Sequence, residues 1–157
     1  MALSESQKGK IVETLVAAHL ILGSDGAINV STPMVDDEGV DLVLNLSGEA
    51  KHLLLQVKSR FSLTGKGAYR AQVRRASFNP RKDLYLLFAY FNKQEGELGD
   101  TMWLVPTIDF SEKTKNQNIN RKYLVFQTRF NSKDMWESYR VEKTLLPERI
   151  VDVLKRW

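Results

Sequence analysis

The stretch 39–60 constrains the fold of this chain more than any other. It contains two apolar runs of strand length, separated by the turn residues Ser47-Gly48-Glu49. This pattern predicts two neighbouring strands joined by a tight turn. Asp41 lies near the start of the first run, and Gln56 and Lys58 lie two residues apart in the second, so the latter pair shares one strand face. An acid, an amide and an ammonium in an apolar sheet are costly unless they pair with one another or with a ligand, so they mark a candidate site.

Length and composition favour one globular domain over residues 1–157, because a chain with 43% hydrophobic residues can bury a core without disulfides. The absence of cysteine excludes thiolate zinc sites and a cysteine nucleophile, and it fits a reducing cytoplasm. No apolar run is long enough to span a membrane, and residues 1–10 lack a signal-peptide core. We therefore expect a cytoplasmic protein with no membrane partner. The net charge of +4 favours anionic partners.

The order of apolar segments predicts an α/β fold with a mixed central β-sheet flanked by helices. Ser4 and Gln7 match a capping box, which predicts a helix that stops at Gly23. Because 11–22 is apolar on nearly all sides, we expect this helix to be embedded against the sheet. The other expected elements are strands at 27–35, 83–92, 102–105 and 123–128, an acidic turn at 36–39, a short helix at 68–76 and a C-terminal helix after Pro147.

Positive charge is concentrated between Ala50 and Lys82, a segment without Asp or Glu. Such a run can be no more than a solvated surface. It can also bind DNA, because Lys and Arg contact phosphates and interleaved Tyr69 and Phe78 can stack on bases. We favour DNA contact and, since phosphate contacts carry little sequence information, structure-selective or weakly sequence-specific binding. The residues expected to contact nucleic acid are Lys8, Arg60, Lys66, Tyr69, Arg70, Gln72, Arg74 and Arg75.

The oxygen-bearing side chains of the candidate site suit a hard cation. Asp41, Gln56 and Glu13, with the main-chain carbonyl of Val57, offer the oxygen ligands that Mg²⁺ prefers. Lys58 could orient or deprotonate an attacking water, or neutralise a developing oxyanion. The cation would lower the pKa of that water and hold a scissile phosphate. These parts outline a site for phosphodiester hydrolysis.

Glu13 also has a simpler interpretation, in which it faces water or pairs with Lys10 on the same helix. Other catalytic layouts fit less well. His19 and His52 lack metal-ligand spacing, and no glycine pattern matches a nucleotide-binding loop. We therefore expect no nucleotide cofactor.

Gly39-Val40-Asp41, followed by Gln56-Val57-Lys58 and preceded by a helix with Lys8-Gly9 and Glu13, resembles the PD-(D/E)XK nuclease superfamily. Within it, the chain is most similar to archaeal Holliday-junction resolvases and small uncharacterised prokaryotic members. The resemblance covers residues 1–60. It implies a restriction-endonuclease-like core, a Mg²⁺ site that accepts Mn²⁺, and DNA as substrate. It also implies a homodimer, since two strands must be cut.

The resemblance further implies that Glu13, Asp41, Gln56 and Lys58 are the catalytic residues, the first three with Val57 as metal ligands. The chain departs from the family pattern at two positions. Val40 replaces the Pro of the family name, and Gln56 stands where Glu is usual. A Gln oxygen can bind Mg²⁺, but the site loses one negative charge and should hold its ion less tightly.

The sequence therefore predicts a Mg²⁺-dependent DNA endonuclease that acts in DNA repair or recombination. The alternative is a DNA-binding protein that keeps the nuclease fold and has lost catalysis through Gln56; a third possibility is an antitoxin-like or structural partner. Aromatic residues in 83–92 and 102–105 are expected in the core. Trp136, Tyr139 and Trp157 could instead cover a dimer surface.

Overall fold

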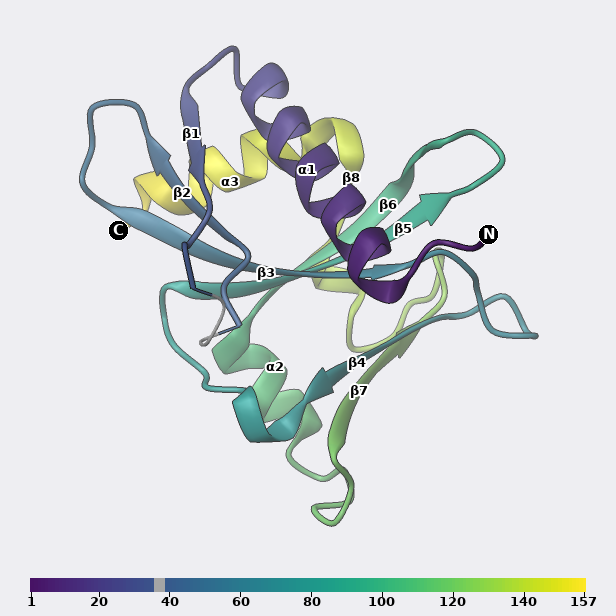
Figure 1. Ribbon diagram of the computed structural model, residues 1–157. Helices are drawn as coiled ribbons and strands as arrows, with labels where there is room; N and C mark the ends of the chain where they lie inside the picture. The colour runs from purple at the N-terminus through teal and green to yellow at the C-terminus, as the bar shows by residue number, and fades with distance from the viewer. Residues whose placement is uncertain (36–38) are drawn as a thin grey trace.

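The computed structural model describes residues 1–35 and 39–157 and has three layers (Figure 1). Helices α1 and α3 cover one face of a central sheet, while α2 and a separate two-stranded ribbon lie on the other. The helices are α1 (Glu5–Gly23), α2 (Thr107–Thr114) and α3 (Leu146–Lys155). The sheet strands are β1 (Ile28–Ser31), β2 (Leu42–Leu46), β3 (His52–Arg60), β5 (Leu84–Asn92), β6 (Glu97–Pro106) and β8 (Arg140–Glu142). The ribbon consists of β4 (Tyr69–Arg74) and β7 (Tyr123–Thr128).

The central sheet is mixed, as the sequence predicted, with the strand order β1-β2-β3-β5-β6-β8. Strands β3 and β5 are parallel, and the other neighbours are antiparallel. The predicted turn between β2 and β3 is confirmed, since Gly48 has a positive φ of 81° and the Glu49 N–H donates to the Leu46 carbonyl. Most of the expected acidic turn at 36–39 lies outside the described residues.

Helix α1 begins where its capping box predicts. The Gln7 N–H donates to Ser4 Oγ at 3.1 Å, and the Ser4 N–H donates to Gln7 Oε1 at 2.9 Å. The helix packs against the sheet as predicted, but the expectation that it does not lie on the surface is wrong. Only one stripe is fully buried, at Val12, Val16 and Leu20, because α1 forms an outer layer and has the sheet on one side only.

The prediction of a helix at 68–76 is also wrong, because this segment forms β4 followed by a short 3₁₀ turn at Arg75–Ser77. Apolar Tyr69, Ala71 and Val73 alternate with polar residues, and all three are buried. The period-two pattern of burial outweighs the helix propensity of Ala and Arg. The C-terminal helix is confirmed as α3, and β1 ends at Ser31, earlier than expected.

The two larger hydrophobic clusters fill the spaces on either side of the sheet. The first joins α1 and α3 to the sheet through aliphatic residues such as Leu44 and Leu55. The second is aromatic and joins the ribbon and α2 to the sheet, with Phe88 and Phe126 stacked at 3.9 Å between ring centroids. Trp136 is 2% exposed within this second cluster, so it belongs to the core rather than to a dimer surface.

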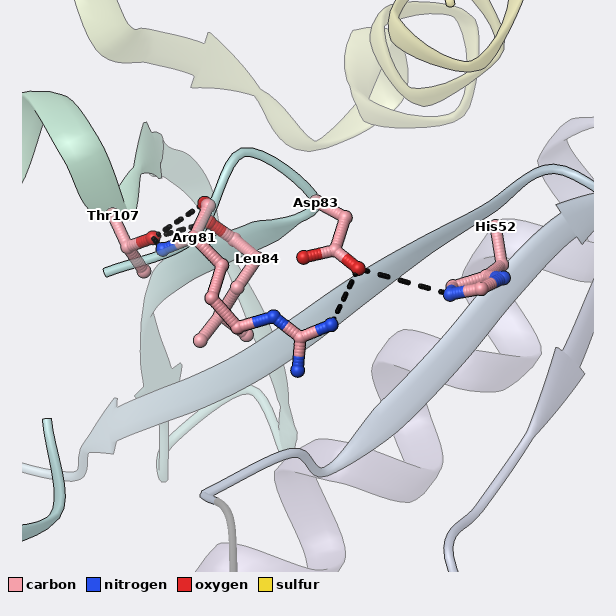
Figure 2. Close-up of polar contacts among 5 residues, drawn as sticks. All are labelled: His52, Arg81, Asp83, Leu84 and Thr107. Atoms are coloured by element: carbon pink, nitrogen blue, oxygen red, sulfur yellow. Dashed lines mark hydrogen bonds and ion pairs between the residues drawn. The ribbon is translucent and has the colours of Figure 1, made fainter. Parts of the chain in front are cut away.

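Helix α2, which the sequence did not reveal, is tied to the sheet by its first residue (Figure 2). The buried Thr107 hydroxyl accepts from the Arg81 N–H at 2.9 Å and lies 2.8 Å from the Leu84 carbonyl, to which it can donate. Nearby, Asp83 Oδ2 lies 2.7 Å from Arg81 Nη2 and 3.8 Å from His52 Nε2. Among the residues that the structure describes, no helix is long and apolar enough to cross a membrane.

Candidate active site and nucleic-acid groove

Asp41 is anchored directly on the edge of β3. Its N–H donates to the Leu55 carbonyl at 2.9 Å, and its Oδ2 accepts from the Val57 N–H at 2.6 Å. These two hydrogen bonds with the main chain of β3 extend the β2–β3 ladder to Asp41. They fix the position of its carboxylate, which is half-buried. The register of the ladder, in which Leu42 pairs with Leu55, brings Asp41 beside Gln56.

Gly39 and Gln56 are in close contact at the same end of the hairpin. Gly39 has a φ of 69°, and a Cβ added there would lie 2.7 Å from Gln56 Nε2. A residue with a side chain would be strained by the backbone and would also displace the amide. The glycine of the Gly39-Val40-Asp41 motif therefore lets the chain turn against Gln56 while Asp41 contacts β3.

Gln56 and Lys58 point toward the ribbon side of the sheet. Their neighbours in the strand, Leu55 and Val57, pack into the cluster under α1. Because successive residues of a strand point to opposite faces, Gln56 and Lys58 point away from α1. Gln56 and Lys58 therefore share one sheet face, as the sequence predicted, and Asp41 lies beside Gln56 at the edge of β3. The Val57 carbonyl lies in the same strand, and these oxygen donors suit a hard cation.

A groove of about 610 Å³, which we call the Lys58 groove, separates the end of β3 from the exposed face of the ribbon. Its charged and polar lining includes Lys58, Arg60, Arg70, Gln72, Tyr123 and Glu5. Three cations face one carboxylate in this set, so the groove favours anions. Hydrogen bonding and charge from Lys8 lower the pKa of Glu5, keeping that carboxylate ionised.

Tyr69 does not occupy this groove, although the sequence predicted that it contacts nucleic acid. It is completely buried, and its hydroxyl lies 3.1 Å from the main-chain carbonyls of both Lys58 and Ala89. Burial strongly raises the pKa of its hydroxyl. Tyr69 thus fastens the ribbon to the strand that carries Lys58. Phe78 likewise packs against Phe110 in the core.

Glu13 lies on α1, which covers the other face of the sheet. Its carboxylate is 21% exposed and lies 3.6 Å from Lys10 Nζ, so the simpler interpretation of an ion pair within the helix is observed. No group of three or more His, Cys, Asp or Glu side chains in residues 1–35 and 39–157 could hold a metal ion. The participation of Glu13 in a metal site with Asp41 stays a prediction.

Five of the eight residues expected to contact nucleic acid fall into three environments. Arg70, Gln72 and Arg74 lie on the solvent side of the ribbon. Lys8 pairs with Glu5 at 2.8 Å. Arg75 donates from Nε and Nη2 to main-chain carbonyls in the loop before β7, at 3.1 Å each, which orders that loop.

A second groove of about 570 Å³, the Lys66 groove, meets the Lys58 groove at Thr64. Lys66 lines it together with Gln127 and Arg129 from the end of β7. Sequence reasoning missed the β7 residues because they lie far along the chain from the basic segment. The only available signal was the alternation of polar and apolar residues in 123–128.

Comparison with solved structures shows the same fold in a protein described as a bacterial homing endonuclease, I-Ssp6803I. The two chains are 19% identical and superpose with a TM-score of 0.61 over 99% of this chain and 94% of that one. MepB is also similar, at 12% identity and a TM-score of 0.42, over 89% of this chain and 97% of its own. No protein-family model and no curated protein matches the sequence.

Proposed function

We propose that this protein is a metal-dependent DNA endonuclease. The observation that carries the proposal is the hydrogen bond from the Val57 N–H to Asp41 Oδ2, which fixes this carboxylate on the strand that carries Gln56 and Lys58. Lys58 also lines a groove rich in cations. A fixed carboxylate, an amide oxygen and a lysine beside a groove lined by cations are suited to phosphodiester hydrolysis.

The side chains have distinct roles in the proposed reaction. Asp41, the Gln56 amide oxygen and the Val57 carbonyl would hold Mg²⁺, with Mn²⁺ as a substitute. Glu13 would join them only if its carboxylate left Lys10 and reached Asp41 from the helix on the other face of the sheet. When bound, the ion would supply charge stabilisation and lower the pKa of a water molecule. Lys58 would orient an attacking water or stabilise the negative charge that develops on the phosphate. Arg60 would hold the flanking backbone by contacts to phosphate oxygens.

The fold shared with I-Ssp6803I supports this proposal, because that protein is described as a homing endonuclease. Membership of the PD-(D/E)XK superfamily fits the same residues and remains part of the proposal. A role in repair or recombination, and a homodimer that would cut both strands of a duplex, belong to it as well.

A specific observation favours a second candidate, an inactive DNA-binding protein with this fold. Gln56 supplies no charge, and the Glu13 carboxylate lies beside Lys10. A site left with the single charge of Asp41 would bind Mg²⁺ weakly. The groove cations would then serve binding alone.

A plasmid-nicking assay separates the two candidates. Supercoiled plasmid is incubated with wild-type protein in Mg²⁺, in Mn²⁺ and in EDTA, and with the variants Asp41→Ala and Lys58→Ala. Lys155→Ala is the matched control, because Lys155 is exposed on α3 across the sheet from the groove.

We expect nicking by the wild type with either metal and none in EDTA. Each site variant should lose about 100-fold or more in rate, and Lys155→Ala should retain the wild-type rate. If the wild type binds duplex, branched and single-stranded DNA but cuts none of them, the inactive binder is correct and the endonuclease proposal is wrong.

A further inference from the structure

The ribbon presents a face that no part of the proposed cleavage chemistry uses. In β4, Tyr69, Ala71 and Val73 are buried, so Arg70, Gln72 and Arg74 point away from the core. The pairing register sets these three opposite Gln127, Val125 and Tyr123 of β7, which occupy the outward positions of that strand. The outward face is therefore two rows of three side chains, and none of the six is an acid.

We propose that this face of the ribbon enters the major groove of duplex DNA and reads base edges, which makes binding sequence-specific. This inference rests on the proposed function, because the ribbon and Lys58 line the same groove. It differs from the expectation of structure-selective or weakly sequence-specific binding, which followed from the small amount of sequence information that phosphate contacts carry.

The chemistry of the outward face suits base recognition. Arg70 and Arg74 can each make two parallel hydrogen bonds to guanine, and Gln72 or Gln127 can do the same with adenine. Val125 offers an apolar contact for a thymine methyl group. Phosphate binding alone gains little from two uncharged amides, because neutralising phosphates requires cations.

The dimensions of the ribbon also fit. Two strands about 5 Å apart can enter a major groove about 12 Å wide, as two-stranded ribbons do. Alternate residues of a strand are about 6.6 Å apart, and stacked base pairs about 3.4 Å apart. Residues 70, 72 and 74 would therefore span about four base pairs.

Cations flank the ribbon at both ends, where the DNA backbone would leave the groove. Lys66 and Arg129 line the Lys66 groove at one end. Arg121 and Lys122 precede β7 at the other end and are exposed. Phosphate contacts at these positions would set the register of the ribbon on the duplex, which is the usual division of labour between phosphate and base contacts.

The outer edge of β7 is occupied, which argues against a partner strand as the ligand. The Gln117 side chain accepts from the Val125 N–H at 2.8 Å and donates to the Val125 carbonyl at 2.9 Å. This amide takes the place of a neighbouring strand at the middle of β7. Addition of a peptide strand there would require that pair of hydrogen bonds to break, whereas the outward face needs no rearrangement.

The test is selection from duplexes with a randomised central segment, performed in EDTA so that nothing is cut. The enriched duplex and an unselected duplex are then titrated by fluorescence anisotropy. Gln72→Ala and Arg74→Lys both preserve the net charge and alter only base-reading groups. Gln94→Ala is the control, because Gln94 is exposed in the β5–β6 turn and lines neither groove.

We expect the wild type to enrich a short motif. Gln72→Ala and Arg74→Lys should each lose about 5-fold to 150-fold in preference for that motif, with a much smaller loss of affinity for the unselected duplex. Gln94→Ala should keep the full preference. Enrichment of no motif by the wild type, or a motif preference that both ribbon variants retain, overturns the proposal.

These outcomes are separable from those of the nicking assay, because selection in EDTA needs no catalysis. A protein that enriches a motif but never cuts supports the ribbon and contradicts the endonuclease. A protein that cuts DNA but enriches no motif supports the endonuclease and contradicts base reading by the ribbon. Circular dichroism of each variant checks that the exposed substitutions leave the fold intact.

Discussion

The Asp41 carboxylate accepts a hydrogen bond from the Val57 N–H at 2.6 Å. This contact joins a candidate metal ligand to the strand that carries Gln56 and Lys58. The same carboxylate therefore contributes to the fold and to the proposed chemistry. Substitutions that differ in shape and charge can separate these two contributions.

Asp41→Asn should abolish cleavage while largely preserving the fold. The amide oxygen of Asn can still accept from the Val57 N–H, but the charge that attracts a cation is lost. We expect plasmid nicking to fall by about 100-fold or more. Asp41→Ala should in addition lower the free energy of unfolding in urea by about 1.5–3 kcal/mol, the value of a hydrogen bond to a charged group. Nicking by Asp41→Asn at the wild-type rate would contradict this role.

Gln56→Glu should strengthen metal binding at a cost in metal-free stability. The new carboxylate lies beside Asp41, and like charges raise the pKa of such carboxyl groups. We expect a lower melting temperature than the wild type in EDTA at pH 7, and a larger rise on addition of Mg²⁺. A folded-state pKa above the unfolded value destabilises the ionised form, so the deficit should shrink as the pH falls toward 5.

Gln94→Glu is the matched control for this experiment, because it makes the same charge change in an exposed turn. Its melting temperature should not respond to Mg²⁺ more than that of the wild type. If Gln56→Glu and Gln94→Glu respond equally to Mg²⁺, Gln56 is not part of a metal site.

Much of the candidate site could be predicted from sequence because it is local. The alternation around Gln56 and Lys58, and the glycine before Asp41, lie within one hairpin. The ribbon could not be predicted in this way, since β4 and β7 pair across about fifty intervening residues and no local pattern reports their register. For this reason the sequence predicted a helix where β4 lies, and it predicted that Tyr69 is exposed.

Gly39→Ala should damage both stability and cleavage. An alanine at position 39 would be strained by the positive φ of the backbone. Its Cβ would also lie only 2.7 Å from Gln56 Nε2. Backbone strain costs about 1–3 kcal/mol, and displacement of Gln56 adds a loss of cleavage. Gly48→Ala is the control, since Gly48 also has a positive φ but has no atom within 4 Å of its would-be Cβ. It should lose similar unfolding free energy and keep its nicking rate.

Tyr69→Phe should slow cleavage without weakening DNA binding. The buried hydroxyl contacts the carbonyls of Lys58 and Ala89, and its loss leaves buried acceptors at a cost of about 1–3 kcal/mol in unfolding free energy. Lys58 would then be held less firmly, so the nicking rate should fall. Affinity for duplex DNA in EDTA should stay at the wild-type value, because Tyr69 has no exposed surface. Tyr85→Phe is the control, since Tyr85 packs against the cluster on the α1 face. A drop in DNA affinity for Tyr69→Phe, with an unchanged nicking rate at saturating DNA, would restore Tyr69 as a nucleic-acid contact.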